Sequence, residues 1–554
     1  MLRYPSLRAP LDILFLVCCV ALTADVLVPE IWGSGKTKDY PLWFWAGQQV
    51  LQGKNLYPSD LNAYFEFIYP PLSAVLLAIP SFFGKIPLYL CLSFLNVVAW
   101  WMTAQYSHAM TGSGRKPGPW LEALPGFVTI TFVFDMFDLG QPNLVLLALM
   151  LYGFWLLGQD RAWMAGSMFA LATAIKVFPV AVFPYLVWRR QWAAAASMVV
   201  FLAVFLFVLP APFRGFQHNV TELKTWYRGM VGSSSEKGFG QRDEQNWSWV
   251  NQSIIAMTHR LTRPVNYNQD DPTKPVRTMN VANLDFKTAN LIVLAISLII
   301  GLGYVAVMPP ASRRTERSDA EEIGILFCLM TVASPLARQY YFMWLFFPMT
   351  VLIHRAAYDP RPRVQAGTWA LLAIAGGLLC LSLPIFPNDL QAYGNNLAAT
   401  VVLVAGLVWH MLHPPTENAL PQAATGLQLD TRTTPTAREE SHVQRTASAG
   451  PRSHRCGFRQ QPRAVIRAAA YQVDLGRSGF RRRLQGGRRS SCKGHRDARL
   501  QDRGAADGRT SRDRRQSQWR RRRAAACAVL RALRCAAGRS VEPVAPSAVR
   551  TRRH

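Results

Sequence analysis

A short stretch in the middle of the chain, ALATAIKVFPVAVFP from Ala170 to Pro184, decides the fold because Lys176 and Pro179 interrupt an otherwise apolar run. Basic residues flank the surrounding apolar segment on both sides, at Arg161 and Arg189. Short loops rich in Lys and Arg favour the cytoplasmic side of a membrane. The segment therefore starts and ends on the same side, and we predict two short helices that turn at Lys176, since irregular backbone at membrane depth is tolerated where it lines a cavity.

The rest of the first 413 residues has the same apolar character. Of 554 residues, 50% are hydrophobic and 17% are charged, against about 25% charged in soluble domains. The composition excludes a water-soluble enzyme and a small disulfide-rich secreted domain. It predicts an all-α polytopic membrane protein with roughly 10–12 transmembrane helices, each of about 20 residues. The first helix follows Arg3 and Arg8 and is expected to stay uncleaved. The candidate segments are 11–29, 86–108, 121–138, 142–158, 163–188, 193–210, 287–308, 322–337, 340–357, 367–385 and 395–413.

The C-terminal part, residues 414–554, has a different amino-acid composition. It carries 32 Lys and Arg against 10 Asp and Glu, a net charge of +22 out of +28 for the whole chain, and 31 of the 32 basic residues are Arg. Two interpretations remain open: an Arg-rich disordered tail, or translation of GC-rich DNA in the wrong frame. No nucleic-acid partner is expected. The sequence therefore divides into a transmembrane domain, 1–413, and this tail.

Charge asymmetry places the polar clusters on one face of the membrane. With the basic loops inside, the outer face receives the loops 30–70 and 211–286, the turn at Gly140, Lys176, and the segment 334–341. Asp39 begins an aromatic interfacial helix that Gly53 ends, and the run 67–72 leads back towards the membrane. The length and aromatic content of the 211–286 loop favour a folded cap.

Three charged residues on this outer face are candidates for chemistry. Asp39 is either a general base for a sugar hydroxyl or the N-cap of its helix. Lys176, an ionisable residue within an apolar run, is either a phosphate ligand or a snorkelling end of a helix. Arg338 is either a second phosphate ligand or an anchor at the membrane surface. Asp135 and Asp138 are interpreted as polar cavity residues, because no third ligand for a metal lies nearby.

The sequence also lacks the usual nucleotide-binding motifs. There is no phosphate-binding loop, no G-x-G-x-x-G after a strand, and no Asp-x-Asp in the body of the chain. A sugar donor handled on the outer face without these motifs is expected to be linked to a lipid.

Six short motifs, in this order, resemble those of Glycosyltransferase family 87 over roughly residues 10–412. They are DYPLWFWA (39–46) with LQG (51–53) and Tyr57, FIYPPL (67–72), GQPN (140–143), KVFP (176–179), NQS (251–253) and SP (334–335). This family comprises integral-membrane enzymes of the GT-C type that use polyprenyl-phosphate sugars. The resemblance implies a GT-C-type helical bundle with extracytoplasmic loop helices. The disordered tail is expected from composition alone.

Carried over to this sequence, the resemblance implies that Asp39 is the catalytic carboxylate. Lys176 and Gln141 are the implied parts of the phosphate and sugar pocket. Together with Arg338 and Asn143 they are the predicted donor-phosphate and sugar ligands, and the predicted acceptor or pocket residues are Tyr69, Asn251, Gln252, Tyr340 and Tyr341. One departure is that Tyr340 and Tyr341 stand where family members often have a histidine pair. His218 and His259 are the alternative histidine partners, although each fits an ordinary loop residue.

Two functions follow from these residues. The first is an inverting, metal-independent glycosyltransferase in the plasma membrane that moves a hexose or pentose, with mannose the first expectation. Its donor would be a polyprenyl-phosphate sugar, its acceptor a glycan or lipid on the extracytoplasmic face, and it would use no cofactor. The second is a transporter or flippase of lipid-linked sugars, which the broken helix at Lys176 also fits.

Overall fold

The computed structural model describes residues 5–32, 39–61, 63–112, 118–232, 234–235, 238–239, 246–269 and 273–415. Almost all of the predicted tail, 414–554, lies outside these residues. The elements of the first half are α1 (Pro5–Ile31), α2 (Tyr40–Leu51), α3 (Pro71–Phe82), α4 (Lys85–Ala109), α5 (Pro119–Leu139), α6 (Asn143–Gly158), α7 (Ala162–Ile175), η1 (Phe178–Ala181), α8 (Val182–Trp188), α9 (Trp192–Ala203) and η2 (Val204–Val208).

The second half begins with the loop region that was expected to form a cap. Its elements are α10 (Ala211–Arg214), α11 (Phe216–Trp226), η3 (Tyr227–Val231), β1 (Ser234–Ser235), β2 (Gly238–Phe239) and α12 (Ile254–Thr262). β1 and β2 form an antiparallel pair. The remaining elements are α13 (Phe286–Val307), η4 (Ala311–Arg313), α14 (Glu316–Ala333), η5 (Gln339–Leu345), α15 (Phe346–Tyr358), α16 (Pro362–Cys380), α17 (Asn388–Ala392) and α18 (Asn395–Leu412).

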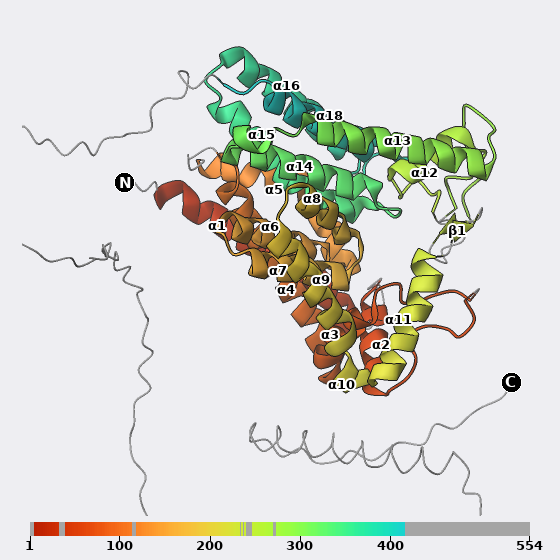
Figure 1. Cartoon of the computed structure of the whole chain (residues 1–554). Coiled ribbons are helices and arrows are strands. Elements are labelled where there is room, and N and C mark those ends of the chain that lie inside the picture. The colour runs from red at the N-terminus through yellow and green to blue at the C-terminus, as the bar shows by residue number, and fades with distance from the viewer. Residues whose placement is uncertain are drawn as a thin grey trace, which may run out of the picture. The chain divides into compact units, whose positions relative to one another are not determined.

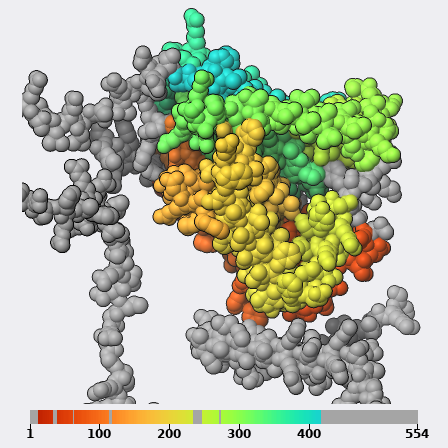
Figure 2. Space-filling view, in the orientation of Figure 1, coloured from red at the N-terminus to blue at the C-terminus, as the bar shows by residue number. Residues whose placement is uncertain are grey.

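The protein is a multi-pass membrane protein built almost entirely of helices, as predicted (Figure 1). Within the described residues, seven helices are long and apolar enough to cross a membrane: Leu11–Ile31, Lys85–Ala109, Pro119–Leu139, Trp192–Arg214, Phe286–Val307, Pro362–Cys380 and Asn395–Leu412. Shorter apolar helices, among them α3, α6 and α7, complete the bundle. α13 lies along the surface as a green band (Figure 2) and exposes leucines such as Leu291 and Leu294, as expected for a helix that faces lipid.

The predicted break at Lys176 is confirmed. α7 ends at Ile175, Lys176 adopts an extended conformation with φ −150° and ψ 123°, and η1 and α8 follow. In a continuous helix the amide of residue 179 would bond to the carbonyl of Ile175, but Pro179 has no N–H. The Ser73 hydroxyl of α3 donates to that carbonyl instead, at 2.8 Å. The break is therefore stabilised by a neighbouring helix.

The segments predicted from the sequence did not include α3. It follows Pro70, and its 12 mostly apolar residues are too few to count as a crossing in the sequence. It packs closely against α2, where a Cβ on Gly47 would lie 2.2 Å from the Ser81 hydroxyl oxygen. The Gln48 amide donates to the Ser81 carbonyl at 2.8 Å. α3 thus supports the loop helix α2 and positions the residues that precede it.

The cap region is folded in its described part and is fastened to the first outer loop. The Trp226 indole donates to the carbonyl of Ile68 at 2.9 Å, and the Glu222 carboxylate accepts from the amide of Leu56 at 2.7 Å. Arg214 forms an ion pair with the same carboxylate. These contacts join α11 to the segment 56–68, on the side where α2, α10 and α11 lie together in Figure 1.

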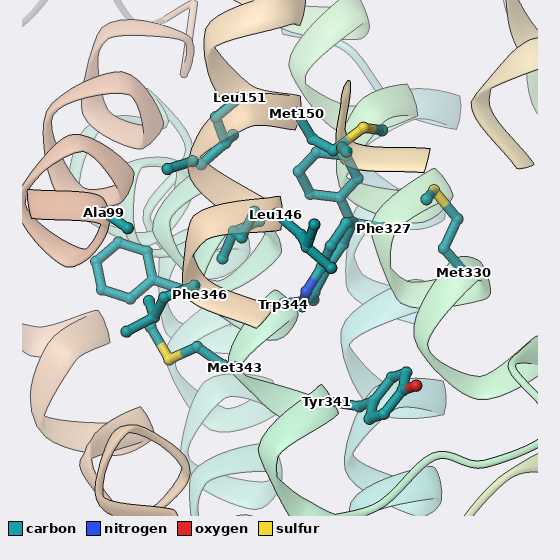
Figure 3. Packing of buried hydrophobic residues seen from close by; sticks show 14 of the residues in the cluster. Ala99, Leu146, Met150, Leu151, Phe327, Met330, Tyr341, Met343, Trp344 and Phe346 are labelled. Carbon is teal, nitrogen blue, oxygen red and sulfur yellow. The ribbon is translucent and has the colours of Figure 1, made fainter. Parts of the chain in front are cut away.

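A buried aromatic and aliphatic core joins α4, α6, α14, η5 and α15 (Figure 3). Trp344 of η5 packs edge-on against Phe327 at a centroid distance of 5.3 Å and against Phe178 at 4.7 Å. Phe178 also contacts Tyr341 at 5.2 Å. In Figure 3, Tyr341 lies at the edge of the core, so the packed interior holds the tyrosine pair in place.

Buried ion pairs lie at the end of the bundle where α14 begins, away from the tyrosine pair. Arg189 pairs with Glu322, and Arg355 donates to Glu321 at 2.8 Å. Arg317 contacts Asp359 at 3.1 Å. Charges buried in this way need their partners, so this end of the bundle is held by specific pairs.

Candidate functional site

A polar cavity of about 100 Å³ brings together residues from six parts of the chain. Its side chains come from the start of α2, from the loop before α3, from the turn between α5 and α6, from the break after α7, from the cap region before α12, and from the start of η5 with the segment before it. The lining residues are Asp39, Leu42, Trp43, Ile68, Tyr69, Gln141, Lys176, Asn246, Leu336, Arg338, Tyr340 and Tyr341. Seven of the ten side chains proposed from the sequence therefore meet at one place.

Asp39 occupies the N-cap position of α2 without acting as a cap. Its side chain makes no hydrogen bond to the first amides of the helix, and its backbone has φ −99° and ψ −10°, whereas capping residues usually have extended backbones. One carboxylate oxygen, Oδ2, instead accepts a hydrogen bond from Nε2 of Gln141 at 2.6 Å. The carboxylate is therefore turned towards the cavity.

Gly140 allows Gln141 to reach Asp39. It ends α5 in the left-handed region with φ +64°, and a Cβ there would lie 2.9 Å from Cζ of Tyr40. Only glycine adopts this conformation without steric cost and fits this space. The Tyr40 hydroxyl also donates to the carbonyl of Phe137 at 2.7 Å. The GQPN motif is thus a tight turn that brings α5 and α6 against α2.

Lys176 points into the cavity and is 8% exposed. Its ammonium group donates to Oδ1 of Asn143 at 3.0 Å and to Oε1 of Gln141 at 3.4 Å. It also lies over the rings of Tyr341, Tyr340 and Tyr69, at 4.5, 5.1 and 5.3 Å from their centroids. These are neutral partners that orient a cation, and in the described part of the chain no carboxylate pairs with it.

Arg338 lines the same cavity from the other side, at the N-cap of η5. Its side chain is half-buried, and the described residues give its guanidinium neither a hydrogen bond nor an ion pair. Two cations therefore face one small cavity, with Asp39 at its edge. Such an arrangement attracts an anion with several oxygens, and guanidinium groups fit phosphate oxygens in pairs.

Tyr69 connects the aromatic wall of the cavity to Gln141. Its hydroxyl donates to Oε1 of Gln141 at 2.8 Å, and its ring packs edge-on against Trp43 at 4.9 Å. Burial raises the pKa of the Tyr69 phenol well above its usual value, so the hydroxyl keeps its proton and remains a donor.

Asn251 and Gln252 were expected in the pocket but lie behind its wall. The Asn251 side chain donates to the carbonyl of Pro335 at 2.9 Å and accepts from the amide of Ala337 at 3.0 Å. Oε1 of Gln252 accepts from the amide of Asn396 at 2.8 Å. The Asn251 amide holds the backbone that precedes Arg338, and the Gln252 amide holds the start of α18. Both residues therefore support the cavity without lining it. Asn143 likewise reaches the cavity only through Lys176.

A second, apolar cavity of about 320 Å³ adjoins the polar one. Trp43, Tyr69 and Gln141 line both cavities. The remaining walls come from α3, α4 and α6, and consist mainly of leucine, isoleucine and proline side chains together with Cys91. Several residues along these helices, such as Ile79 and Leu95, also have exposed faces. The site therefore joins a charged compartment to an apolar groove.

The other residues singled out in the sequence lie elsewhere. His218 contacts Glu222 on α11, and His259 stacks on Trp247 at 4.2 Å, so neither is a partner of Asp39. Asp135 and Asp138 are absent from the lining of both cavities. Within the described ranges, no group of three or more His, Cys, Asp or Glu side chains is arranged to hold a metal ion.

Sequence reasoning missed five lining residues: Leu42, Trp43, Ile68, Asn246 and Leu336. Trp43 belongs to the helix that was expected at the membrane interface, but it is buried, with 3% of its surface exposed. Its position four residues after Asp39 is the signal that places both on one face of the helix. Asn246 had no such signal, because it reaches the cavity from the long cap region.

Comparison with known proteins identifies the family that this chain resembles. The model of Glycosyltransferase family 87 matches residues 67–335, a region that includes Gln141 and Lys176 but neither Asp39 nor Arg338. A relative from Mycobacterium tuberculosis (strain CDC 1551 / Oshkosh) is the polyprenol-phosphate-mannose-dependent alpha-(1-2)-phosphatidylinositol pentamannoside mannosyltransferase. It is 26% identical over 323 residues, which cover 56% of this chain and 64% of the relative's length. The resemblance expected from the sequence motifs is therefore confirmed: residues 67–335 of this chain match Glycosyltransferase family 87.

Proposed function

We propose that this protein is a membrane glycosyltransferase that takes its sugar from a polyprenyl-phosphate donor. The observation that carries the proposal is the junction of two cavities: Asp39, Lys176 and Arg338 face a polar compartment that shares a wall with an apolar groove. A donor with a sugar, a phosphate and an isoprenoid chain has this same order of polar, anionic and apolar parts. The match to Glycosyltransferase family 87 supports this assignment.

The donor phosphate is placed between Lys176 and Arg338. Neither cation pairs with a carboxylate among the described residues, so both charges are available to an anion. α6 begins at Asn143, beside Lys176, and the N-terminus of a helix favours negative charge. The isoprenoid chain would then leave through the groove between α3, α4 and α6.

Asp39 acts as the general base in this scheme. It removes the proton from an acceptor hydroxyl while that oxygen forms a bond to the anomeric carbon of the sugar. The bond from this carbon to the phosphate oxygen breaks, and its electron pair remains on the phosphate. Lys176 and Arg338 stabilise the charge that develops there. A single displacement inverts the anomeric centre, and the two cations supply the stabilisation without a metal ion.

The reaction is proposed to occur on the extracytoplasmic face of the plasma membrane. α5 and α14 end at the site, while α6 and α15 start there. The opposite ends of these helices carry the basic loops, including Arg314, Arg317 and Arg361. Because basic loops favour the cytoplasm, the site faces outward.

Mannose is the proposed sugar, and a glycan or lipid the proposed acceptor. The Mycobacterium tuberculosis relative is described as dependent on polyprenol-phosphate-mannose and as a phosphatidylinositol pentamannoside mannosyltransferase. The tyrosine-lined cavity suits a sugar, because aromatic faces pack against its C–H groups while its hydroxyls contact polar side chains.

A transporter or flippase of lipid-linked sugars is the second candidate. The discontinuous helix at Lys176 favours it, because transporters place broken helices at their binding sites. The two candidates differ in one measurable respect, since a transporter moves the lipid-linked sugar across the membrane without forming a bond.

The donor is tested by sugar transfer with the full chain in isolated membranes. Labelled polyprenyl-phosphate mannose and a labelled nucleotide sugar are offered in parallel, with conversion of the nucleotide sugar to a lipid-linked donor blocked. Transfer from the lipid-linked donor alone supports the proposal. Transfer from the nucleotide sugar contradicts it, and sugar movement without bond formation supports the transporter.

A further inference from the structure

We propose that Gln141 is a positioning residue that keeps the base Asp39 and the phosphate ligand Lys176 apart while orienting both. The inference rests on the proposed function, because it assigns to Gln141 a role towards those two groups. It differs from a role in binding the donor, since the amide acts here on protein side chains.

The contacts of the Gln141 amide carry this inference. Its Nε2 donates to Oδ2 of Asp39 at 2.6 Å, and its Oε1 accepts from the Tyr69 hydroxyl at 2.8 Å and from the Lys176 ammonium at 3.4 Å. The side chain is 3% exposed. The amide therefore forms a neutral bridge between an anion and a cation.

The neighbouring charges determine how the amide is turned. With the opposite orientation, the amide oxygen would face the carboxylate of Asp39, and the NH₂ group would face the ammonium of Lys176. Both contacts would join groups of the same kind, acceptor to acceptor and donor to donor. The present orientation is therefore the one that satisfies all three neighbours. Tyr69 adds a third anchor that does not depend on either charge.

The separation matters because the two charges would otherwise attract each other. No ion pair joins Asp39 to Lys176 in the part of the chain that the structure describes. In a cavity of low dielectric, such a pair would be strong. Direct pairing would make Asp39 a weaker base and would occupy the cation that the donor phosphate needs. A neutral residue of this length therefore keeps both groups ready for the substrate.

The first test replaces Gln141 with a charged residue of nearly the same shape. In Gln141→Glu the new carboxylate pairs with Lys176 and faces Asp39. A like charge raises the pKa of a carboxyl group, so the acid limb of the pH profile of kcat is expected to move upward by about one pH unit. Undecaprenyl phosphate should bind at least about tenfold more weakly, because Lys176 is now neutralised. The matched control is Gln159→Glu, which changes an exposed residue at the end of α6.

The second test removes one anchor without changing charge or shape. Tyr69→Phe loses the hydroxyl that holds Oε1 of Gln141. The loss of one neutral hydrogen bond is expected to lower kcat by about two- to tenfold, with the KM for the donor unchanged. Tyr393→Phe, at an exposed tyrosine, is the control and should match the wild type.

Protein level in the membrane is measured for every variant. The inference would be overturned if two properties of Gln141→Glu stayed at their wild-type values. These are the acid limb of the pH profile of kcat and the affinity for undecaprenyl phosphate. The proposed function is judged separately, by sugar transfer with the wild type. If the wild type binds undecaprenyl phosphate but transfers no sugar, the proposed activity fails. Weaker binding in Gln141→Glu would still support the positioning role of Gln141.

Discussion

Replacing Lys176 by methionine tests the electrostatic part of the account. Methionine has nearly the length of lysine and fills the space between Tyr340, Tyr341 and Tyr69 without a charge. Lys176 is 8% exposed, and no carboxylate pairs with its ammonium among the described residues. The substitution therefore removes a contact to the donor phosphate and breaks no ion pair of the fold.

The expected loss follows from the strength of one charged hydrogen bond. Such a bond contributes about 1.5–3 kcal/mol. At about 1.4 kcal/mol for each factor of ten, kcat/KM should fall by roughly 10–150-fold. The stability of the protein should be unchanged or higher, because an unpaired buried charge is removed.

Sugar transfer by membranes that contain equal amounts of each protein measures the first effect, and thermal unfolding in detergent measures the second. Lys85→Met is the matched control, since the Lys85 side chain is half-exposed and its ammonium lies 3.6 Å from Oε1 of Glu30. Transfer by Lys176→Met within about threefold of the wild type would refute the placement of the donor phosphate, because such a loss is below about 1 kcal/mol.

Two further substitutions test the structure around the site, and one truncation tests the tail. Gly140→Ala places a residue with a Cβ in the left-handed region, which costs about 1–2 kcal/mol before any clash. The variant should therefore unfold at a lower temperature. Wild-type stability of this variant would count against the tight turn. Arg189→Met leaves Glu322 buried and unpaired, at a cost of about 3–5 kcal/mol, whereas Arg190→Met, at an exposed neighbour, should be neutral; equal stability of the two variants would contradict the buried pair. Truncation after His413 should leave transfer within about twofold of the full chain, and a larger loss would show that the tail contributes.

The sequence predicted the membrane fold and the break at Lys176 because both depend on local features. Apolar runs of sufficient length indicate helices, and Pro179 removes the amide that a continuous helix needs. α3 escaped prediction because its 12 residues fall short of a crossing, and its position depends on packing against α2. Local patterns therefore indicated which segments are helical, while contacts between helices determined the short supporting ones.

The site was predictable in its charged members but not in its internal contacts. The sequence alone left Asp39 as either a base or an N-cap, because the choice depends on Gln141, about one hundred positions away. Asn251 and Gln252 have the polarity of pocket residues, yet they bind backbone behind the wall. Residue type indicated which side chains are polar. The fold determined which of them face the cavity.

The most direct test of the central claim is sugar transfer by Asp39→Asn. Asparagine keeps the shape of the side chain but accepts no proton at neutral pH, and the loss of a general base typically lowers a rate by about 10²–10⁴-fold. Asp160→Asn, at an exposed aspartate after α6, serves as the control and should be fully active. The account predicts that Asp39→Asn is present in the membrane at the wild-type level, binds undecaprenyl phosphate, and transfers mannose at no more than about one hundredth of the wild-type rate. Full transfer by this variant would contradict the assignment of Asp39 as the base.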